Sequence, residues 1–546
     1  MTQSLIPAAL TRTSPADLPG LSWEGPGDSI SADSASIQAA LLQLEQPLHV
    51  VTHALGVGVT TVGNVTPGVN GKSPQFLGLL PAVRLTDLGD AEFRNTYGVK
   101  YAYYAGAMAN AIASTRMVIA LGKAGILGSF GAAGVVPTRL ESAILEIKAA
   151  LPDAPYAFNL INSPNEPAME RGAVELYLKH GIRTVEASAY MDVTPALAYY
   201  RVAGLEAGPA GSVVIRNHII AKLSRKEVAT RFLSPAPKDV LERLVAEGKV
   251  SAEQAQLAQH VPMADDITVE ADSGGHTDNR PLVIVLPAIL ALRDELQARY
   301  QYAIVPRVGA AGGIATPHAV YAAFAMGAAY VATGSINQAC IEAGASEHTR
   351  NLLATAGMAD VIMAPAADMF EMGVKVQVLR RGTMFGQRAL KLYELYSRYN
   401  SIEEIPTDER EKLEKNVFKR DLSAVWAETV QFFTERDPRQ IERANADPRQ
   451  KMALIFRWYL GLSSRWSNMG EKGREMDYQI WCGPSMGAFN DWVRGTYLEK
   501  AENRTVVDVA LQLLTGAAYL TRLRHLAAFS VKTTPTLEHY TPTSPL

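Results

Sequence analysis

The chain has 546 residues, of which 48% are hydrophobic and 20% are charged, and its formal net charge at pH 7 is −3. This composition is that of a globular protein of two to four domains, and it argues against disorder over most of the length. The balance of 52 basic and 55 acidic side chains leaves no positive excess for a nucleic-acid surface. Two distant cysteines, Cys340 and Cys482, exclude a disulfide framework and a cysteine-based zinc site, and they indicate a reducing cytoplasm.

Residues 1–47 are rich in Ser, Pro, Ala and Gly, which predicts a loosely structured leader. They contain no basic segment followed by an apolar core, so no secretory signal is predicted. The apolar stretches 282–292 and 319–341 are too short or too often interrupted by polar residues and glycine to span a membrane. We expect buried helix and strand at both places.

From about residue 100 onward, short apolar runs alternate with helical patterns, which is typical of a parallel sheet covered by helices. Eight such runs favour a closed TIM (β/α)8 barrel, with a doubly wound open sheet as the alternative α/β fold. The predicted strands are 101–108, 125–130, 156–161, 184–187, 213–223, 267–271, 303–308 and 329–333. The clearest predicted helices are 138–150, 166–180, 281–300 and 317–326.

One connection of the predicted barrel, residues 224–266, is oversized and predicts two or three helices. An insertion after a barrel strand can cover the active-site mouth as a lid, or it can be a surface insertion, and the sequence leaves both open. Residues 389–546 lack strand patterns and contain five of the six tryptophans, which predicts a separate, mostly α-helical unit. The predicted barrel with its insertion therefore covers 48–388.

Glycine-rich strings follow the last two predicted strands, where barrel enzymes often bind phosphate. Gly312 and Gly313 follow the seventh strand, and Gly334 and Ser335 follow the eighth. Glycines allow backbone N–H groups to approach phosphate oxygens. We therefore expect a phosphate-bearing cofactor or substrate at this end of the barrel, with ordinary turn chemistry as the alternative.

Other polar residues are predicted to lie at the same end. His276 follows Gly274 and Gly275 directly after the sixth strand, so it is a candidate for proton transfer, and a structural histidine is the alternative. Lys222 ends the fifth strand, where it would point a cation into the mouth or face solvent. Met108 and Asn159 end the first and third strands. No cluster has metal-ligand spacing, so no metal site is predicted.

Longer strings of the sequence resemble the PfaD family, the trans-acting enoyl reductases of polyketide and polyunsaturated fatty acid synthases. They extend over about residues 48–525 and include YAYYAGAMAN, FNLINSPNEP, ADSGGHTDNRPL, AAGGIATP, MALIFRWYLG and DYQIWCGPSMGAFNDW. The barrel part is similar, more distantly, to nitronate monooxygenases and flavin-type enoyl-ACP reductases. One departure from the family pattern is Asn162, where histidine is common in the family.

The resemblance implies an FMN-dependent enoyl reductase of polyketide biosynthesis. Hydride would pass from NADPH, or NADH, through FMN to the α,β double bond of an enoyl thioester on an acyl carrier protein. His276 would assist proton transfer. The cofactor-binding residues would be Met108, Asn159, Lys222, Gly274, Gly275, Gly312, Gly313, Gly334 and Ser335, of which the last four would contact the phosphate.

Two other functions remain open at this point. A nitronate monooxygenase-type flavoenzyme would share the cofactor, and a non-catalytic scaffold would bind synthase modules through the helical unit. The expected partners are acyl carrier protein domains of a polyketide synthase, with no nucleic acid and no membrane, in the cytoplasm. The oligomeric state is left open, with a homodimer as one candidate.

Overall fold

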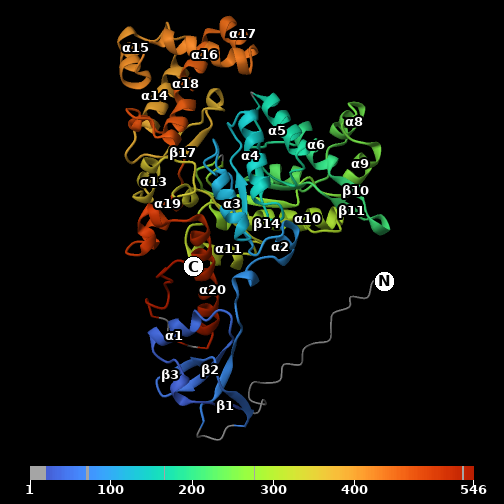
Figure 1. Ribbon diagram of the computed structural model, residues 1–546, viewed down its shortest axis with the longest axis vertical. Helices are drawn as coiled ribbons and strands as arrows, with labels where there is room; N and C mark the ends of the chain where they lie inside the picture. The colour runs from blue at the N-terminus through green and yellow to red at the C-terminus, as the bar shows by residue number, and fades with distance from the viewer. Residues whose placement is uncertain (1–19, 69–72, 165, 276, 530, 532–533) are drawn as a thin grey trace. The chain divides into compact units, whose positions relative to one another are not determined.

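The computed structural model describes residues 20–68, 73–164, 166–275, 277–529, 531 and 534–546 (Figure 1). Its internal contacts divide the chain into two compact units. One unit comprises Met1–Leu88 with Thr515–Tyr540, and the other comprises Gly89–Leu514 with Thr541–Leu546. The predicted boundaries after residues 47 and 388 do not coincide with this division.

The first unit is built on short antiparallel sheets. Strand β1 (Leu21–Glu24) pairs with β4 (Asn64–Pro67), and β2 (Leu48–His53) lies between β3 (Gly56–Thr60) and β5 (Phe76–Leu80). Helix α1 (Ser34–Leu41) and the second part of α20 (Val506–Ala527) complete the unit.

The prediction of a loose leader is wrong from residue 20 on. Trp23 in β1 is 1% exposed, and its indole N–H donates a hydrogen bond to the carbonyl oxygen of Val62 at 2.9 Å. The buried guanidinium of Arg522 in α20 donates hydrogen bonds to the carbonyl oxygens of Leu41 and Gln43, at 3.2 and 2.7 Å. These partners are far away in the sequence, so the local composition of residues 20–47 does not reveal them.

The second unit contains the predicted closed barrel of eight parallel strands. The strands are β6 (Tyr103–Ala105), β7 (Leu127–Phe130), β8 (Ala157–Ile161), β9 (Thr184–Ser188), β12 (His218–Leu223), β13 (Asp266–Glu270), β14 (Arg307–Ala311) and β15 (Val331–Thr333). The predicted run 213–223 divides into β12 and a short strand, β11 (Val213–Ile215), which forms a hairpin with β10 (Leu205–Ala207). Strand β14 begins at Arg307, later than the predicted start at residue 303.

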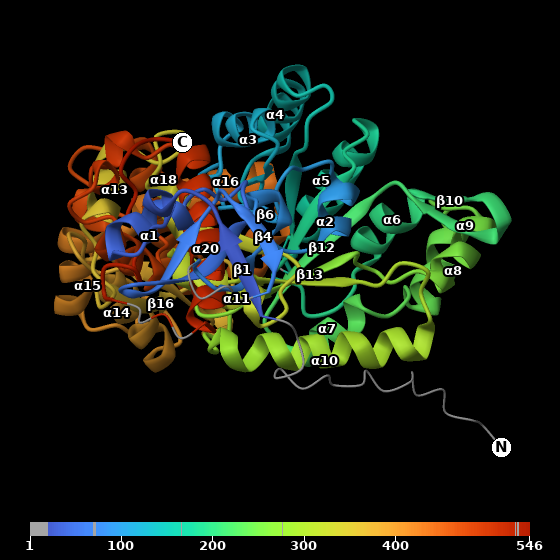
Figure 2. The same cartoon turned by 90° about the horizontal axis from the view of Figure 1, so that it is seen from below.

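Helices cover the outside of the barrel. They are α2 (Ala91–Tyr97), α3 (Thr115–Lys123), α4 (Pro137–Ala150), α5 (Pro167–Lys179), α6 (Pro195–Ala203), α10 (Leu282–Tyr300) and α11 (Pro317–Ala325). Four of them, α4, α5, α6 and α11, begin with a proline, whose fixed φ suits the first helical position. Figure 2 shows α10 along the outside of the barrel, where it packs against α7 and β14.

The insertion predicted at 224–266 forms three helices, α7 (Lys226–Phe232), α8 (Lys238–Ala246) and α9 (Ala252–Leu257). Helix α7 packs on α10, α8 packs on α6, and α9 packs on β10. The insertion therefore lies on the flank of the barrel.

After the barrel, the second unit continues with one hairpin and further helices. The hairpin consists of β16 (Val361–Pro365) and β17 (Lys375–Leu379). The helices are α12 (Ser335–Gln338), α13 (Glu347–Ala354), α14 (Phe385–Arg398), α15 (Thr407–Leu413), α16 (Leu422–Arg436), α17 (Arg439–Ala446), α18 (Pro448–Met469) and α19 (Ser485–Trp492). The mostly helical character predicted beyond residue 388 is confirmed, but α14 to α19 belong to the same compact unit as the barrel, while most of α20 belongs to the other.

The tryptophans of this region form part of an aromatic core. Trp426, Trp458, Trp466 and Trp481 pack against a buried cluster from α14, α16, α18 and the hairpin. That cluster includes Phe385, Phe418, Phe456 and Tyr459. Four of the five late tryptophans thus cover the buried core of the helical part.

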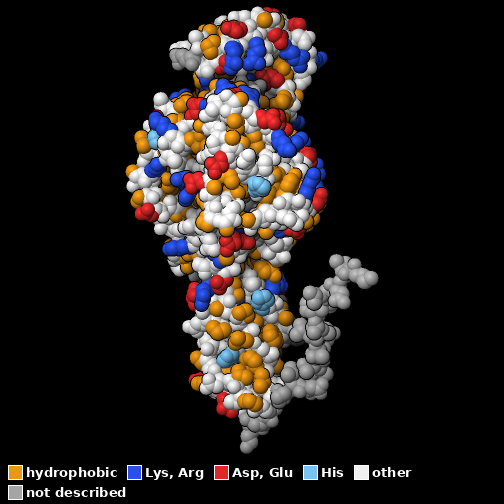
Figure 3. All heavy atoms as spheres, turned by 90° about the vertical axis from the view of Figure 1, so that its right-hand side faces the viewer, with side chains coloured by type: hydrophobic (Ala, Val, Ile, Leu, Met, Phe, Trp, Pro, Cys, Tyr) orange, Lys and Arg blue, Asp and Glu red, His pale blue; other side chains and the backbone are white. Residues whose placement is uncertain are grey.

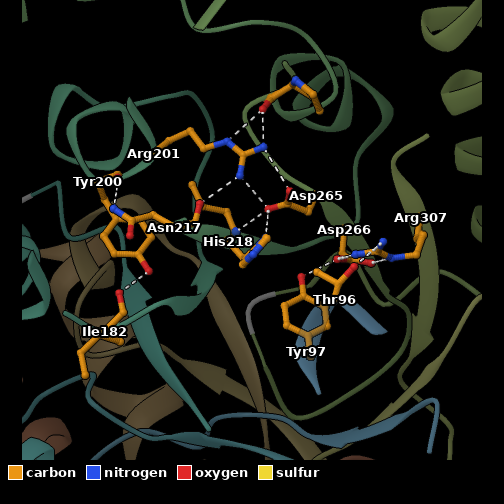
Figure 4. A network of polar contacts seen from close by, with 12 residues as sticks. Thr96, Tyr97, Ile182, Tyr200, Arg201, Asn217, His218, Asp265, Asp266 and Arg307 are labelled. Carbon is orange, nitrogen blue, oxygen red and sulfur yellow. Dashed lines mark hydrogen bonds and ion pairs between the residues drawn. The ribbon is translucent and has the colours of Figure 1, made fainter. Parts of the chain in front are cut away.

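Two buried ion pairs hold the amino-terminal ends of neighbouring barrel strands (Figure 4). Arg201 of α6, 1% exposed, donates hydrogen bonds to both carboxylate oxygens of Asp265, at 2.7 and 3.2 Å. Arg307 at the start of β14 does the same to Asp266, at 2.8 and 2.7 Å. Burial would raise the pKa of Asp265, but Arg201 and His218 outweigh burial and hold that pKa well below its usual value.

Surface charge is mixed. Basic and acidic side chains are interspersed over the face of the molecule in Figure 3. Helix α20 is long and apolar enough to cross a membrane by length and composition, but 78% of its apolar window is buried inside the protein, as in the core helix of a globular protein.

Candidate functional site

A cavity of about 1150 Å³ lies at the carboxyl ends of the barrel strands. All nine predicted cofactor-binding residues line it: Met108, Asn159, Lys222, Gly274, Gly275, Gly312, Gly313, Gly334 and Ser335. The predicted catalytic residue, His276, lies outside the described residues, next to Gly275. The barrel thus gathers residues from six different strand ends around one space, as expected for this fold.

The insertion does not cover this cavity. None of its described residues, from 224 to 265, is part of the cavity wall. Of the two alternatives left open for this segment, the cavity wall therefore favours a surface insertion over a lid. The outer wall comes instead from α16 and α18, whose positions relative to the barrel depend on contacts over hundreds of residues. One of them is the hydrogen bond from Asn110 Nδ2, in the loop after β6, to Ser464 Oγ of α18, at 2.9 Å.

The glycines after β14 and β15 keep backbone groups open to the cavity. Gly312 and Gly313 have φ of +79° and +74°, a conformation that favours glycine. A Cβ atom at Gly313 or Gly334 would have no heavy atom within 4 Å, so a side chain there would extend into open space. In the described part of the chain, the N–H groups of Gly312, Gly313 and Gly334 donate no hydrogen bond.

Gln338 adds a further donor beside these loops. The residue follows Gly334 in α12, lines the cavity and is 2% exposed. Its Nε2 atom is fully buried and has no hydrogen-bond partner among the described residues. A buried amide without a partner is costly. Free N–H donors, an unpaired amide and the absence of side chains together suit an anion such as the phosphate of FMN.

Lys222 occupies a buried charge cluster at the base of the cavity. Its Nζ atom lies 3.4 Å from Glu186 Oε1 of β9 and 3.5 Å from Glu270 Oε1 of β13. Burial alone would lower the pKa of Lys222, but the carboxylates of Glu270 and Glu186 outweigh burial and raise the pKa above its usual value. Lys222 therefore carries its positive charge at neutral pH, held in place between two strands.

Sequence reasoning missed Glu186 and Glu270, although a signal was present. The tetrapeptide Thr-Val-Glu-Ala occurs at 184–187 and again at 268–271, in the two strands that flank β12. A charged residue inside an otherwise apolar buried strand needs a partner of opposite charge. Glu270 also explains a glycine, because a Cβ atom at Gly275 would lie 2.4 Å from Glu270 Oε1.

Asn159 presents an acceptor to the cavity. Its side-chain nitrogen donates to the carbonyl oxygen of Glu186 at 3.0 Å and to Ser188 Oγ at 2.9 Å. The side-chain oxygen receives no hydrogen bond from the described residues, so it is available to an N–H group of a ligand. Met108 is held by close packing, since a Cβ atom at Gly131 would lie 1.7 Å from the Met108 carbonyl oxygen.

The position that departs from the family pattern, Asn162, donates through Nδ2 to Glu170 Oε2 at 3.3 Å. Glu170 lines the cavity, and it also accepts hydrogen bonds from Tyr190, at 2.9 Å, and Thr194. Burial raises the pKa of Glu170, and these three donors oppose the rise. Asn162 therefore has a structural partner beside the cavity.

Three family models match the chain. The nitronate monooxygenase model matches residues 93–419, and the N-terminal domain of fatty acid synthase subunit PfaD matches residues 23–81. The inserted helical domain of [acyl-carrier-protein] S-malonyltransferase matches residues 399–478, which include α15 to α18. The first match covers the barrel, and the other two cover the additions to it.

Individual relatives agree with these matches. A polyunsaturated fatty acid synthase subunit from Thraustochytrium sp. is 49% identical over 95% of this chain and 34% of its own length. Polyketide biosynthesis protein PksE from Bacillus subtilis is 43% identical over 85% of this chain and 60% of its own length. The chain thus spans less than two thirds of these curated relatives.

One solved structure is matched over its full length by this chain. The enoyl reductase domain of MlnA, from the macrolactin biosynthesis cluster of Bacillus amyloliquefaciens, has a TM-score of 0.78 and 39% sequence identity. The match covers 82% of this chain and 100% of that domain. With the barrel, its helical additions and the PfaD N-terminal domain all matched, the chain belongs to the PfaD-like enoyl reductases, which are built on the nitronate monooxygenase barrel.

Proposed function

We propose that this protein reduces the α,β double bond of enoyl thioesters carried by acyl carrier protein, with FMN as cofactor and NADPH or NADH as reductant. The observation that carries the proposal is one continuous cavity that joins glycine loops suited to a phosphate, the polar groups of Asn159 and Lys222, and an outer wall of helices. Small-molecule pockets usually measure about 300–1,000 Å³. A volume of about 1150 Å³ leaves room for a cofactor and a substrate chain together.

The position of each residue in the cavity suggests its role. The N–H groups of Gly312, Gly313 and Gly334 would bind the phosphate, and the side-chain oxygen of Asn159 would accept a hydrogen bond from a polar ring edge. Lys222 would hold a positive charge where negative charge develops. Bound FMN would supply hydride transfer between a nicotinamide and the β-carbon of the thioester.

A direct test is the visible spectrum of the purified protein. We expect bound or added FMN to give a flavin spectrum that NADPH bleaches without oxygen, and that an enoyl-pantetheine thioester restores. Restoration by oxygen with a nitronate, but not by the thioester, would favour the nitronate monooxygenase alternative, to which the match of residues 93–419 gives weight. A protein that takes up no FMN would refute both and leave a scaffold role.

His276 is proposed to donate a proton or a hydrogen bond to the thioester as it accepts hydride. We expect His276→Ala to keep its FMN but to lose about 100-fold or more in enoyl reduction, the usual effect of removing a positioned acid or base. The measurement is thioester turnover at saturating NADPH, with flavin content determined in parallel. His260→Ala, an exposed histidine of the insertion, is the matched control. Unchanged turnover in His276→Ala would exclude the role.

The partner proposed for the protein is an acyl carrier protein of a polyketide or polyunsaturated fatty acid synthase. Support comes from a relative named as a polyunsaturated fatty acid synthase subunit, from a relative named as a polyketide biosynthesis protein, and from the helical segment matched to [acyl-carrier-protein] S-malonyltransferase. A cytoplasmic location fits the two cysteines, which are both free and buried.

A further inference from the structure

Helix α18 presents one face to the cavity over several turns. The cavity wall includes its residues Leu454, Arg457, Trp458, Gly461, Ser464, Arg465 and Asn468. They recur at the three- and four-residue spacing that places side chains on one side of a helix. Ser464 touches the barrel mouth through Asn110, and at 1.5 Å per residue Gly461 lies about 4.5 Å, and Leu454 about 15 Å, further along the helix axis. The lining residues of α18 therefore extend along the helix well beyond its contact with Asn110.

Gly461 is anomalous within this face. Glycine is among the poorest residues for the interior of a helix. Two other helical glycines have a packing reason, since a Cβ atom at Gly122 would lie 2.5 Å from Leu151 Cδ1, and one at Gly487 would lie 2.0 Å from Met358 N. A Cβ atom at Gly461 would meet nothing within 4 Å. The missing side chain therefore enlarges the cavity and does not relieve a close contact.

The walls around this part of the cavity are mainly apolar. The residues that supply them are Phe432 and Phe433 of α16, Leu454 and Trp458 of α18, and Leu140, Met169, Ala173 and Leu176 of α4 and α5. Such a surface favours a hydrocarbon chain and disfavours groups that need hydrogen bonds.

Several charged groups of the same region are paired, whereas Arg465 on the same face of α18 donates to Met469 Sδ at 3.5 Å. Arg436 of α16 donates two hydrogen bonds to Glu166, at 3.1 and 2.7 Å. Arg457 donates to Glu371 at 3.1 Å, and the indole N–H of Trp458 donates to a carboxylate oxygen of α16 at 3.1 Å. These pairs hold α16 and α18 in place and leave the apolar side chains to face the ligand.

We propose that this outer half of the cavity is the channel for the acyl chain, and that Gly461 determines its width and hence the chain length accepted. The inference rests on the proposed function, because it assigns the occupant of the same site. The apolar side chains of α4, α5, α16 and α18 would bury the methylene groups of an acyl tail, which need no hydrogen bonds. Gly461 is thus a specificity-determining residue.

The test compares Gly461→Leu with Gly172→Leu. Gly172 lies in α5, also has no atom within 4 Å of its Cβ position, and is not part of the cavity wall. The substrates are crotonyl-pantetheine, with four acyl carbons, and trans-2-dodecenoyl-pantetheine, with twelve. We expect Gly461→Leu to lower kcat/KM for the long chain about tenfold or more relative to the short chain. Gly172→Leu should leave the ratio unchanged.

Flavin content and bleaching by NADPH should be unchanged in both variants, since neither residue touches the glycine loops. If Gly461→Leu loses its flavin, the smaller substitution Gly461→Ala is measured in its place. We then expect kcat/KM for the long chain, relative to the short chain, to fall by a smaller factor. An unchanged ratio would overturn the assignment, and an equal loss on both substrates would place the common pantetheine arm there instead. A wild-type protein that reduces neither thioester would refute the proposed function itself, which separates the two failures.

Discussion

Replacing Lys222 with methionine is expected to abolish most enoyl reduction. The ammonium group is removed from the base of the cavity, and the carboxylates of Glu186 and Glu270, each 3.4–3.5 Å from it, are left facing one another. Loss of one preorganised charged donor typically costs about 100-fold or more in turnover. Turnover of an enoyl-pantetheine, flavin content per chain and the thermal unfolding midpoint would be measured together.

The Lys222→Met variant should also lower the thermal unfolding midpoint, because it leaves the buried carboxylates of Glu186 and Glu270 without the opposite charge between them. Lys226→Met, an exposed lysine of α7, is the control and should be neutral. Wild-type turnover in Lys222→Met would contradict the role of the cluster.

The largest effect on stability is expected from Arg201→Met. The substitution leaves Asp265 buried without the guanidinium that pairs with it at 2.7 Å, and it removes the two hydrogen bonds to the carbonyl oxygen of Pro262. Breaking a buried ion pair from one side costs about 3–5 kcal/mol. Thermal unfolding of the full chain should show a clear drop in midpoint, even with FMN added.

Arg216→Met provides the comparison for this experiment. Arg216 pairs with Glu206 at 3.0 Å, but both side chains are about half exposed, so the substitution should change stability little. Equal midpoints for Arg201→Met and Arg216→Met would show that the buried pair adds nothing to the stability of the barrel.

The barrel itself was predictable because its strands are buried on both faces and form apolar runs separated by helical patterns. The topology then placed the strand ends together, so Gly312, Gly334 and Lys222 could be assigned to one site from sequence position alone. Local composition gave a wrong prediction where contacts between distant residues determine the structure. Trp23, in the segment predicted to be a loose leader, donates a hydrogen bond to Val62, and no local sequence pattern predicts that contact.

The wall of the site could not be predicted for the same reason. Asn110 and Ser464 meet across 354 residues of sequence, and this contact brings α18, not the insertion, to the barrel mouth. The insertion at 224–266 had the expected position in the chain for a lid, but its helices pack on α6, α10 and β10. Glu186 and Glu270 were missed because a mostly apolar run predicts a buried strand without indicating a role for its one charged residue.

The same charged residues have a consequence for how the barrel forms. Glu186, Lys222 and Glu270 come from three adjacent strands, β9, β12 and β13, whose alignment is set by β12 between its two neighbours. Sliding β12 by one residue would turn Lys222 to the opposite face of the sheet and leave two carboxylates unpaired in the interior. The cluster therefore favours a single strand register. The surrounding valines, isoleucines and alanines would allow a slipped pairing, but such a pairing would separate Lys222 from the two carboxylates.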